Sequence, residues 1–306
     1  MTKMPPTTCD SLLPSGNERV ATRCVCCAGD RILRSPAVLM PFIADRIFHW
    51  TPVSIDPSWG LKTIANGQAY SICNTLYCEK CGFVFLDLRF SDKELARLYA
   101  NYRDDAYVNL RDYYEPGYRE RNQVLQVGNV YIRDVEAFLE PVLKLPVKLL
   151  DWGGDTGKNT PFKTCQTVFD IYDISDKMPV FGARRVTKTE VQSTVYDLIV
   201  CSNVLEHVPY PASLLGEICA CMGEQTILYL EVPLEEIMKA PFTGFHRNKR
   251  HWHEHINFFS QAALQKLLEA CRLNVIAQKI LDVETEGRAA SLFQFACRLA
   301  SAPPEA

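Results

Sequence analysis

The sequence lacks a strong excess of charge of either sign, and it lacks long apolar runs. Its 306 residues carry 33 Lys and Arg against 36 Asp and Glu, a net charge near −3. Non-specific nucleic-acid binding draws on a basic field, which this balance does not supply. No stretch approaches the roughly 18 apolar residues of a membrane span, and the polar N-terminus lacks a signal-peptide core. We expect a cytoplasmic protein without membrane insertion or a nucleic-acid partner.

Histidine is also scarce, yet four of the six histidines lie within ten positions: His246 and three in "HWHEHINFFS" at 251–260. Such a group can form a metal site, an acid/base centre, or a polar turn that joins a strand to the next helix. The H-E-x-x-H spacing of a helical metal pair is absent, which disfavours the metal interpretation. The choice between the other two depends on where the segment lies in the fold.

Thirteen cysteines are present, and most lie singly in apolar runs typical of small buried hydrophobic residues. The exceptions form two C-x-x-C pairs, Cys24 with Cys27 and Cys78 with Cys81. Two such pairs can hold one zinc ion tetrahedrally, with no open position for water. We predict a structural zinc site in a zinc-ribbon-like module over residues 23–90. Two alternatives stay open: Cys26 replaces a neighbour as ligand, or the thiols are reduced and unligated.

Helical patterns follow this module. Ser91 with Glu94 forms a capping box at the start of one helix, and apolar residues recur at helical spacing over a long segment from 117 to 143. We expect a helical lid or connector over residues 91–145. Tyr102, in a tyrosine-rich stretch, is a candidate to cover a cofactor, although packing between helices explains such aromatic residues equally well. Residues 1–22 and 301–306 are expected to be tails, the first disordered.

From about 146 to 300, short apolar runs alternate with helical intervals, as in an α/β domain with a doubly wound parallel sheet and helices on both faces. Successive strands are predicted to end near Asp151, Asp173, Ser202 and Glu231. A helix capped by Ser260 follows, and the last two apolar runs are expected to form an antiparallel pair at one edge. This domain is the largest part of the chain.

Ligands of such sheets bind outside the carboxyl ends of the strands. The turn after the first strand, Gly153-Gly154-Asp155-Thr156-Gly157, does not satisfy G-x-G-x-x-G, which disfavours a nicotinamide-dependent oxidoreductase. Asp173 follows the second strand, where an acid can accept both hydrogen bonds of a ribose diol. The turn, the acid and the loop after Ser202 together predict a nucleoside-type ligand.

In this order, "LLDWGGDTGKNTPF", "FDIYDIS", "YDLIVCSNVLEHVPYP", "LYLEVP" and "HEHINFFS" resemble the class I S-adenosylmethionine-dependent methyltransferases, which have a Rossmann-like fold. The chain is similar to the branch with an N-terminal zinc module, which includes sugar C-methyltransferases and polysaccharide-cluster enzymes. The resemblance implies that Asp151, Gly153 and Gly157 line the methionine moiety of S-adenosylmethionine, that Asp173 binds its ribose hydroxyls, and that Ser202, Asn203 and Val204 flank it. The family usually has glycine where Asp155 stands. Gly154 and Asp155 in the same turn, and Tyr102, are further cofactor-binding candidates.

Methyl transfer to oxygen or carbon requires the acceptor to lose a proton, and histidine is the natural base near neutral pH. The histidine-rich run follows the strand predicted to end near Glu231, and its family equivalent implies a role in catalysis or in binding the acceptor. Our first candidates are Glu254 and His255, then His253. His207, which follows Glu206 in "LEHV" after the strand predicted to end near Ser202, ranks lower.

We therefore expect a methyltransferase that acts on oxygen or carbon of a small polar acceptor, a sugar, nucleotide-sugar or glycan end. The partner is a small molecule of carbohydrate type, and the protein is a monomer or homodimer. The alternative is a non-catalytic scaffold, in which a zinc ribbon and a cofactor-like fold serve binding alone and Asp155 marks a decayed pocket.

Overall fold

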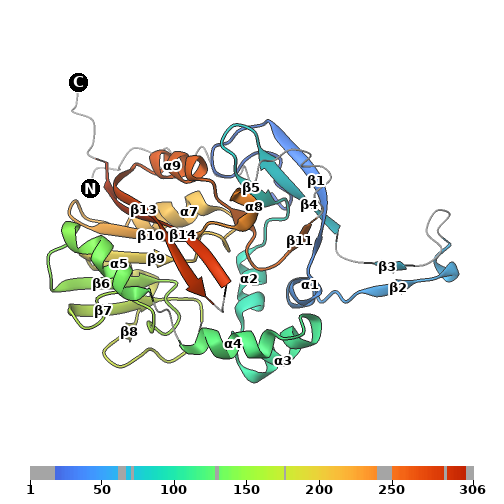
Figure 1. Cartoon of the computed structure of the whole chain (residues 1–306), viewed down its shortest axis with the longest axis horizontal. Coiled ribbons are helices and arrows are strands. Elements are labelled where there is room, and N and C mark those ends of the chain that lie inside the picture. Colours follow the sequence, from blue (N-terminus) through green and yellow to red (C-terminus); the bar gives the residue numbers. More distant parts are fainter. Residues whose placement is uncertain are drawn as a thin grey trace.

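A computed structural model describes residues 18–60, 67–69, 72–127, 131–175, 177–239, 250–285 and 288–300. The predicted tails fall largely or wholly outside this range, as does His246. The main sheet has the order β13-β14-β10-β9-β6-β7-β8 (Figure 1). Its strands are β6 (Val147–Trp152), β7 (Gln166–Tyr172), β8 (Arg184–Arg185), β9 (Leu198–Ser202), β10 (Ile227–Pro233), β13 (Leu273–Thr285) and β14 (Arg288–Leu299).

The strand directions confirm the predicted α/β domain and its antiparallel edge. β6 pairs in parallel with β7 and β9, and β9 pairs in parallel with β10. β14 lies antiparallel between β10 and β13, so that the sheet is mixed. The carboxyl ends of β6, β7 and β9 are therefore neighbours at one edge, as the sequence predicted.

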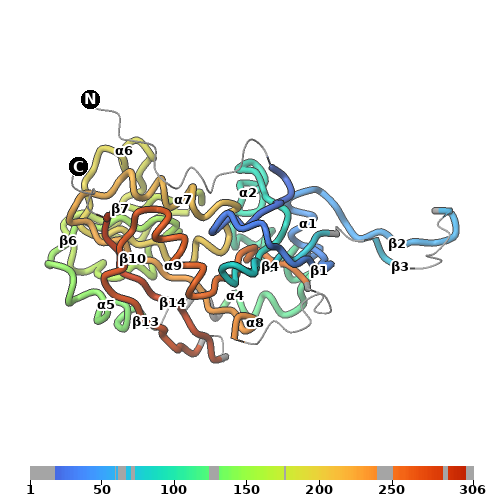
Figure 2. Tube along the Cα trace, turned by 90° about the horizontal axis from the view of Figure 1, so that it is seen from above, coloured from blue at the N-terminus to red at the C-terminus, as the bar shows by residue number. Residues whose placement is uncertain are grey.

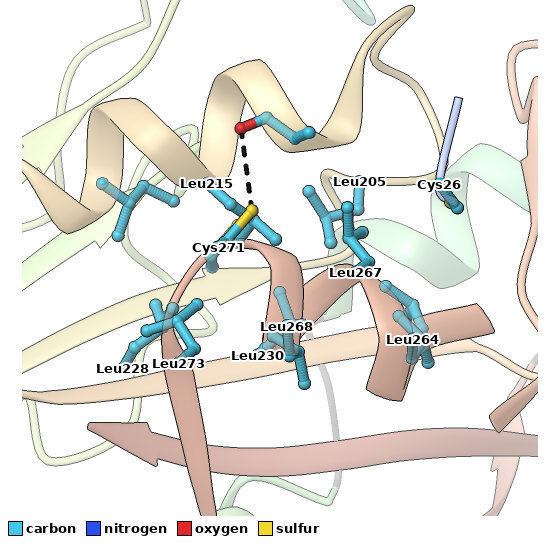
Figure 3. Packing of buried hydrophobic residues seen from close by; sticks show 14 of the residues in the cluster. Cys26, Leu205, Leu215, Leu228, Leu230, Leu264, Leu267, Leu268, Cys271 and Leu273 are labelled. Atoms are coloured by element: carbon cyan, nitrogen blue, oxygen red, sulfur yellow. Dashed lines mark hydrogen bonds between the residues drawn. The ribbon is translucent and has the colours of Figure 1, made fainter. Parts of the chain in front are cut away.

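Helices cover both faces of this sheet because the strands are buried on both sides. α7 (Pro211–Cys219) and α9 (Gln261–Ala270) pack on one face, where leucines of both helices meet those of β10 (Figure 3). Cys271 lies in the same cluster, and its thiol donates to the Ala212 carbonyl at 3.9 Å. α6 (Lys188–Ser193) also borders this face, through Val191. α5 (Ile132–Leu139) covers the opposite face through Val135 and Leu139.

The connector is helical, as predicted. α2 (Asp92–Tyr99) begins with the capping box of Ser91 and Glu94. It is followed by α3 (Asp105–Tyr114), α4 (Tyr118–Val127) and α5. A short 3-10 turn, η3 (Glu140–Val142), follows α5 directly. The single amphipathic segment expected at 117–143 is thus two helices, interrupted near Tyr131, which is the N-cap of α5.

The N-terminal module has a second sheet, and its composition differs from the prediction. β1 (Ile32–Leu39), β4 (Ile72–Cys78) and β5 (Val84–Leu86) come from residues 23–90. β11 (Arg250–Trp252) and β12 (Asn257–Phe258) come from the distant histidine-rich run and extend the order to β11-β1-β4-β5-β12. The run is therefore part of this sheet and not a simple polar turn. α1 (Pro41–Phe48) and the short α8 (Glu236–Lys239) lie beside the sheet.

A narrow hairpin projects from the module in two views turned by 90° (Figures 1 and 2). It consists of β2 (Val53–Ile55) and β3 (Gly67–Ala69), with a 3-10 turn, η2 (Pro57–Trp59), after the first strand. The sequence analysis did not predict this element. Within the described ranges, no helix has the length and apolar character needed to cross a membrane.

Asn257 and Arg89 fix the junction between the module and the main sheet. The Asn257 amide donates to the carbonyls of Leu205 and Val208 at 2.8 and 2.7 Å. The fully buried Arg89 guanidinium donates to the Pro209 carbonyl at 2.8 Å and to the Asn257 amide oxygen at 3.3 Å. These bonds satisfy polar groups away from water and hold the loop after β9 against β12.

Ser260 adds a second tie at this junction, because its hydroxyl caps α9 by accepting from Ala263 N–H at 3.0 Å and donates to the Cys81 carbonyl at 2.7 Å. We expect Ser260→Ala to lower the free energy of unfolding by about 2 kcal/mol, one part for the cap and one for the lost tie. Thr187→Ala, which removes only the exposed cap of α6, should cost about 1 kcal/mol. Urea unfolding measures both, and equal losses would contradict the tie to Cys81.

Candidate functional site

The four predicted cysteine ligands converge. The sulfurs of Cys24 and Cys81 are 3.6 Å apart, and those of Cys27 and Cys78 are also 3.6 Å apart. All four lie within 4.8 Å of one another, as one ion requires. Four thiolates at zinc bond length would be separated by about 3.8 Å in a tetrahedron, close to these values. The cluster is therefore shaped for one tetrahedral metal ion.

Tight turns create this convergence. Ala28 N–H donates to the Cys24 carbonyl, and Gly82 N–H, at φ +72, donates to the Cys78 carbonyl. Cys26 is fully buried and stands outside the group of four, so the geometry favours Cys24 and Cys27 over Cys26 as ligands. Hydrogen bonds among the four thiols lower the pKa of Cys27 and Cys78 and raise that of Cys24, so without an ion the cluster shares protons that a bound metal ion would displace.

The turn after β6 packs so closely against neighbouring residues that no side chain would fit at its three glycines. Gly153 and Gly157 have φ of +83° and +77°. A Cβ on Gly153 would lie 2.5 Å from Val204 Cγ2, and one on Gly157 would lie 2.6 Å from Ile171. A Cβ on Gly154 would meet the Asp151 carboxylate at 2.3 Å. The glycines thus let the turn pack tightly against Val204, Ile171 and Asp151 at the carboxyl ends of β6, β7 and β9.

Asp155 tolerates its place in this turn because aspartate adopts the left-handed conformation more readily than most residues, and its φ is +51°. Its N–H donates to Asp173 Oδ2 at 2.9 Å. Its carboxylate accepts from the Ser175 hydroxyl at 2.9 Å and from the Lys177 ammonium at 3.1 Å. Asp155 therefore ties the glycine turn to the loop after β7, and its carboxylate already has protein partners.

Asp173 and Asp151 differ in their environments. Asp173 accepts from two backbone N–H groups, those of Asp155 and Ser175 at 2.9 and 2.6 Å, which fix its carboxylate at the end of β7. Asp151 is buried and accepts a hydrogen bond from the Thr160 hydroxyl. Burial raises the pKa of the Asp151 carboxyl to about 7. A cationic group bound beside Asp151 would favour its ionised form.

Ser202 and Asn203 are organised by a residue that the sequence analysis treated only as the end of a strand. The Glu231 carboxylate, 1% exposed, accepts from the Ser202 hydroxyl at 2.7 Å and from the Asn203 amide at 3.0 Å. Asn203 is held in the left-handed region, at φ +54°. Three further donors complete the set around the Glu231 carboxylate: Tyr131, Tyr229 and Gln294. This hub holds the loop after β9 in place.

Tyr102 lies between the lid and the glycine turn. Its ring makes edge contacts with Tyr99 and Tyr107, at centroid distances of 5.6 and 5.2 Å. The Lys177 ammonium lies 5.1 Å from the centre of the same ring and also binds Asp155. Tyr102 therefore approaches the predicted cofactor residues through Lys177, and the lid packs as an aromatic cluster at the same time.

The structure brings His207 and His255 together, although they come from distant parts of the chain. Their ring centroids are 4.6 Å apart. Glu206 joins them, with one carboxylate oxygen 3.8 Å from His207 Nε2. Glu206 is fully buried, and neither of its carboxylate oxygens has a hydrogen-bond partner within the described residues. This Glu206–His207–His255 cluster lies two residues beyond Val204 and thus beside the predicted cofactor loop.

The three groups differ in their ionisation. Burial raises the pKa of the Glu206 carboxyl to about 7. Burial and the nearby His255 lower the pKa of the His207 imidazole to about 3, so that this ring is neutral. The hydrogen bond between Glu235 and His255, 2.8 Å long, and the acids around it outweigh burial and raise the pKa of His255 to about 9. Strongly shifted groups that face one another are typical of functional sites.

Glu254, our first catalytic candidate, is engaged in an ion pair. Arg111 Nη1 lies 2.8 Å from its carboxylate, and the Tyr107 hydroxyl donates to it at 3.5 Å. Despite burial, Arg111 holds the pKa of Glu254 down at about 2. Such a carboxylate is a weak base near pH 7, whereas the Glu206 carboxyl, with a pKa of about 7, is matched to proton transfer at that pH.

His253 points away from this cluster and lies 3.6 Å from Glu115, with 47% of its side chain exposed. His251 is exposed as well. The alternation along β11 explains this, because Trp252 between them is buried and donates to the Thr75 hydroxyl. The sequence analysis considered Glu206 only as the neighbour of His207 and did not single out Glu235; the only sign available was that both acids closely follow predicted strands.

Solved structures that resemble this chain include several methyltransferases. A 1,6-didemethyltoxoflavin-N1-methyltransferase from Burkholderia thailandensis, with bound S-adenosylhomocysteine, is 17% identical, covers 63% of this chain and 88% of its own, and has a TM-score of 0.45. A magnesium protoporphyrin IX methyltransferase from Synechocystis PCC 6803 is 16% identical, with coverages of 68% and 100% and a TM-score of 0.42. An S-adenosylmethionine-dependent methyltransferase from Leishmania major is 11% identical, with coverages of 61% and 77% and a TM-score of 0.43. At such TM-scores these likenesses carry no argument about this chain.

A search of curated proteins gave no match. The family model described as a methyltransferase domain, in contrast, matches residues 118–278 of the 306, which is more than half of the chain. The matched range begins in α4 and ends in β13, and it includes the glycine turn, Asp173, the loop after β9 and the histidine-rich run. The chain therefore belongs to the methyltransferase domain family.

Proposed function

We propose that this protein is an S-adenosylmethionine-dependent methyltransferase that acts on oxygen or carbon of a small polar acceptor. S-adenosylmethionine, when bound, supplies an electrophilic sulfonium methyl group. The observation that carries the proposal is the continuity of the loop after β9. Val204 in this loop lies against Gly153 of the glycine turn, and Glu206 and His207 follow shortly after it. Cofactor and acceptor would meet along this one loop.

The residues present fit the cofactor. Gly153 and Gly157 fold the turn tightly onto the carboxyl end of the sheet, where ligands of such folds bind, and Asp173 holds a carboxylate where the hydroxyls of a ribose could donate to it. The buried Asp151 offers a second carboxyl beside the turn, suited to the positive charge of an amino group. Tyr102 and the lid would exclude water from the methyl group, which aids an in-line displacement.

The proton of the acceptor is taken up in the Glu206–His207–His255 cluster. His207 and His255 are partly open to solvent, with 21% and 34% of their side chains exposed, so an acceptor can reach them. Glu254 lies next to the cluster and binds Arg111 of α3, which positions the lid over it. A polar acceptor suits this charged surface, and the sugar, nucleotide-sugar or glycan class follows from the sequence resemblance.

We also propose that Cys24, Cys27, Cys78 and Cys81 bind a structural zinc ion. The separation of their sulfurs and the burial of three of them support this role. All four positions of a tetrahedral ion would be filled by thiolates, so the ion stabilises the module and takes no part in methyl transfer. The link from Cys81 to Ser260 would transmit this stability to α9.

The cofactor site is tested by Asp173→Ala, which removes the proposed ribose ligand and should weaken S-adenosylmethionine binding about 10²-fold in calorimetry. Glu224→Ala is a matched control, because Glu224 is exposed in the turn before β10, at the opposite edge of the sheet. Unchanged affinity in Asp173→Ala would contradict the site. If the wild-type protein binds neither S-adenosylmethionine nor S-adenosylhomocysteine, the scaffold function replaces the enzyme.

The acid/base cluster is tested by turnover of an acceptor found in a mass-spectrometric screen of nucleotide-sugars for the gain of one methylene unit. We expect His207→Ala and His255→Ala to lower turnover about 10²-fold or more while S-adenosylmethionine still binds, because the acceptor would keep its proton. Glu254→Gln should lower turnover to a similar extent, because it removes the ion pair with Arg111 beside the cluster. His251→Ala, an exposed histidine of the same run, should keep full activity. Full activity in all three site variants would show that the cluster takes no part in the reaction.

The zinc site is tested by cobalt substitution, since cobalt bound to thiolates gives an intense charge-transfer absorption. Cys78→Ser should lose this absorption and a large part of the stability of the protein, because a structural metal contributes folding free energy. Cys26→Ser, with a buried thiol outside the group of four, should keep the absorption. Its loss in Cys26→Ser alone would move the ligand assignment to Cys26.

A further inference from the structure

The Glu206–His207–His255 cluster has a second set of features that proton transfer alone does not require. One ligand atom from each residue lies within 4.8 Å of the others, on a patch formed by the loop after β9 and the segment before β12. Two imidazoles and one carboxylate are a common ligand set for divalent transition metals. The question is whether the hydrogen bonds around these residues turn the right atoms toward a common centre.

Both imidazoles use Nδ1 for bonds that point away from the cluster. His207 Nδ1 lies 3.1 Å from the Glu254 carbonyl and 2.9 Å from the Tyr99 hydroxyl. A carbonyl oxygen only accepts, so Nδ1 carries the proton and the Nε2 lone pair stays available. His255 Nδ1 donates to the Glu235 carboxylate at 2.8 Å, so Nε2 is the nitrogen left for a metal ion, which on binding would displace the proton of Nε2 into solvent. Metal-binding histidines in proteins are oriented by such bonds from Nδ1 to a carbonyl or carboxylate.

The His207 lone pair and the Glu206 carboxylate together favour binding of a cation. With the proton on Nδ1, the Nε2 lone pair of His207 faces a Glu206 oxygen at 3.8 Å, two electron-rich atoms side by side. Glu206 is fully buried, and its carboxylate oxygens meet no hydrogen-bond donor among the described residues. An unpaired buried carboxylate is costly unless it binds a proton or a metal ion. Asn257 and the backbone bonds of Ile256 and Asn257 to the Glu206 carbonyl keep Glu206 in this position.

We propose that Glu206, His207 Nε2 and His255 Nε2 bind one divalent transition-metal ion, separate from the cysteine site. Three protein ligands leave further positions of the ion open, as in catalytic metal sites. An oxygen atom of the acceptor would occupy one of them and would thereby be held next to the loop Ser202 to Val204. This role rests on the proposed methyltransferase function, whereas metal binding itself does not.

The test is a cobalt titration of the full-length, zinc-loaded wild-type protein followed by visible absorption and metal analysis. We expect a bound cobalt ion with the weak bands of nitrogen and oxygen ligands and without the thiolate charge-transfer absorption that marks the cysteine site. Glu206→Gln and His255→Ala each remove a ligand and should weaken cobalt binding more than 100-fold. Glu235→Gln changes only the orienting bond and should weaken it about 10- to 100-fold.

His251→Ala is the matched control and should bind cobalt like the wild type. Because Glu206 is buried, thermal unfolding of Glu206→Gln shows whether the variant folds, and His255→Ala, at a half-exposed position, provides a second measurement. If the wild type binds no cobalt beyond the cysteine site, or if the variants bind it equally well, the proposal is wrong. Methyl transfer by such a metal-free protein would leave the proposed function intact with the cluster acting as a direct base.

Discussion

The hydrogen bonds of Asn257 are the interaction on which the site depends. Its amide donates to two carbonyls of the loop after β9, and its backbone pairs with β5 of the cysteine module. One residue therefore links the second sheet to a loop of the main sheet. Together with the bond from Ile256 N–H to the Glu206 carbonyl, it fixes the loop that carries Glu206 and His207 against the segment that carries His255.

The buried carboxylates Glu231, Asp151 and Glu206 differ in how many hydrogen-bond donors surround them. Glu231 receives hydrogen bonds from five side chains, so its charge is satisfied and it holds the loop. Asp151 receives one hydroxyl, and Glu206 none within the described residues. The two acids with few donors are those with raised pKa values, at the proposed cofactor and acceptor ends of the site. Among these three acids, the two with few hydrogen-bond donors lie where the proposed ligands could supply more.

The main sheet, apart from the two-residue β8, could be predicted because its strands are apolar runs followed by glycine or acidic residues. The ends of parallel strands also share one edge of a sheet. That rule placed the glycine turn, Asp173 and the loop from Ser202 correctly side by side. β11 and β12, of three and two residues, carry no readable alternation; they are strands because β1 and β5 offer open edges. The meeting of His207 with His255 and the pairing of Glu254 with Arg111 are likewise products of tertiary structure.

The shared sheet has a consequence for the modularity of the protein. Residues 23–90 hold all four proposed zinc ligands, yet β11 and β12, from a distant part of the chain, cover the outer strands β1 and β5 of the module's sheet. A fragment limited to those residues would expose the edges of β1 and β5, which are templates for pairing between chains. The cysteine module and the methyltransferase sheet are interleaved in the chain and must be inherited, exchanged or engineered as one unit.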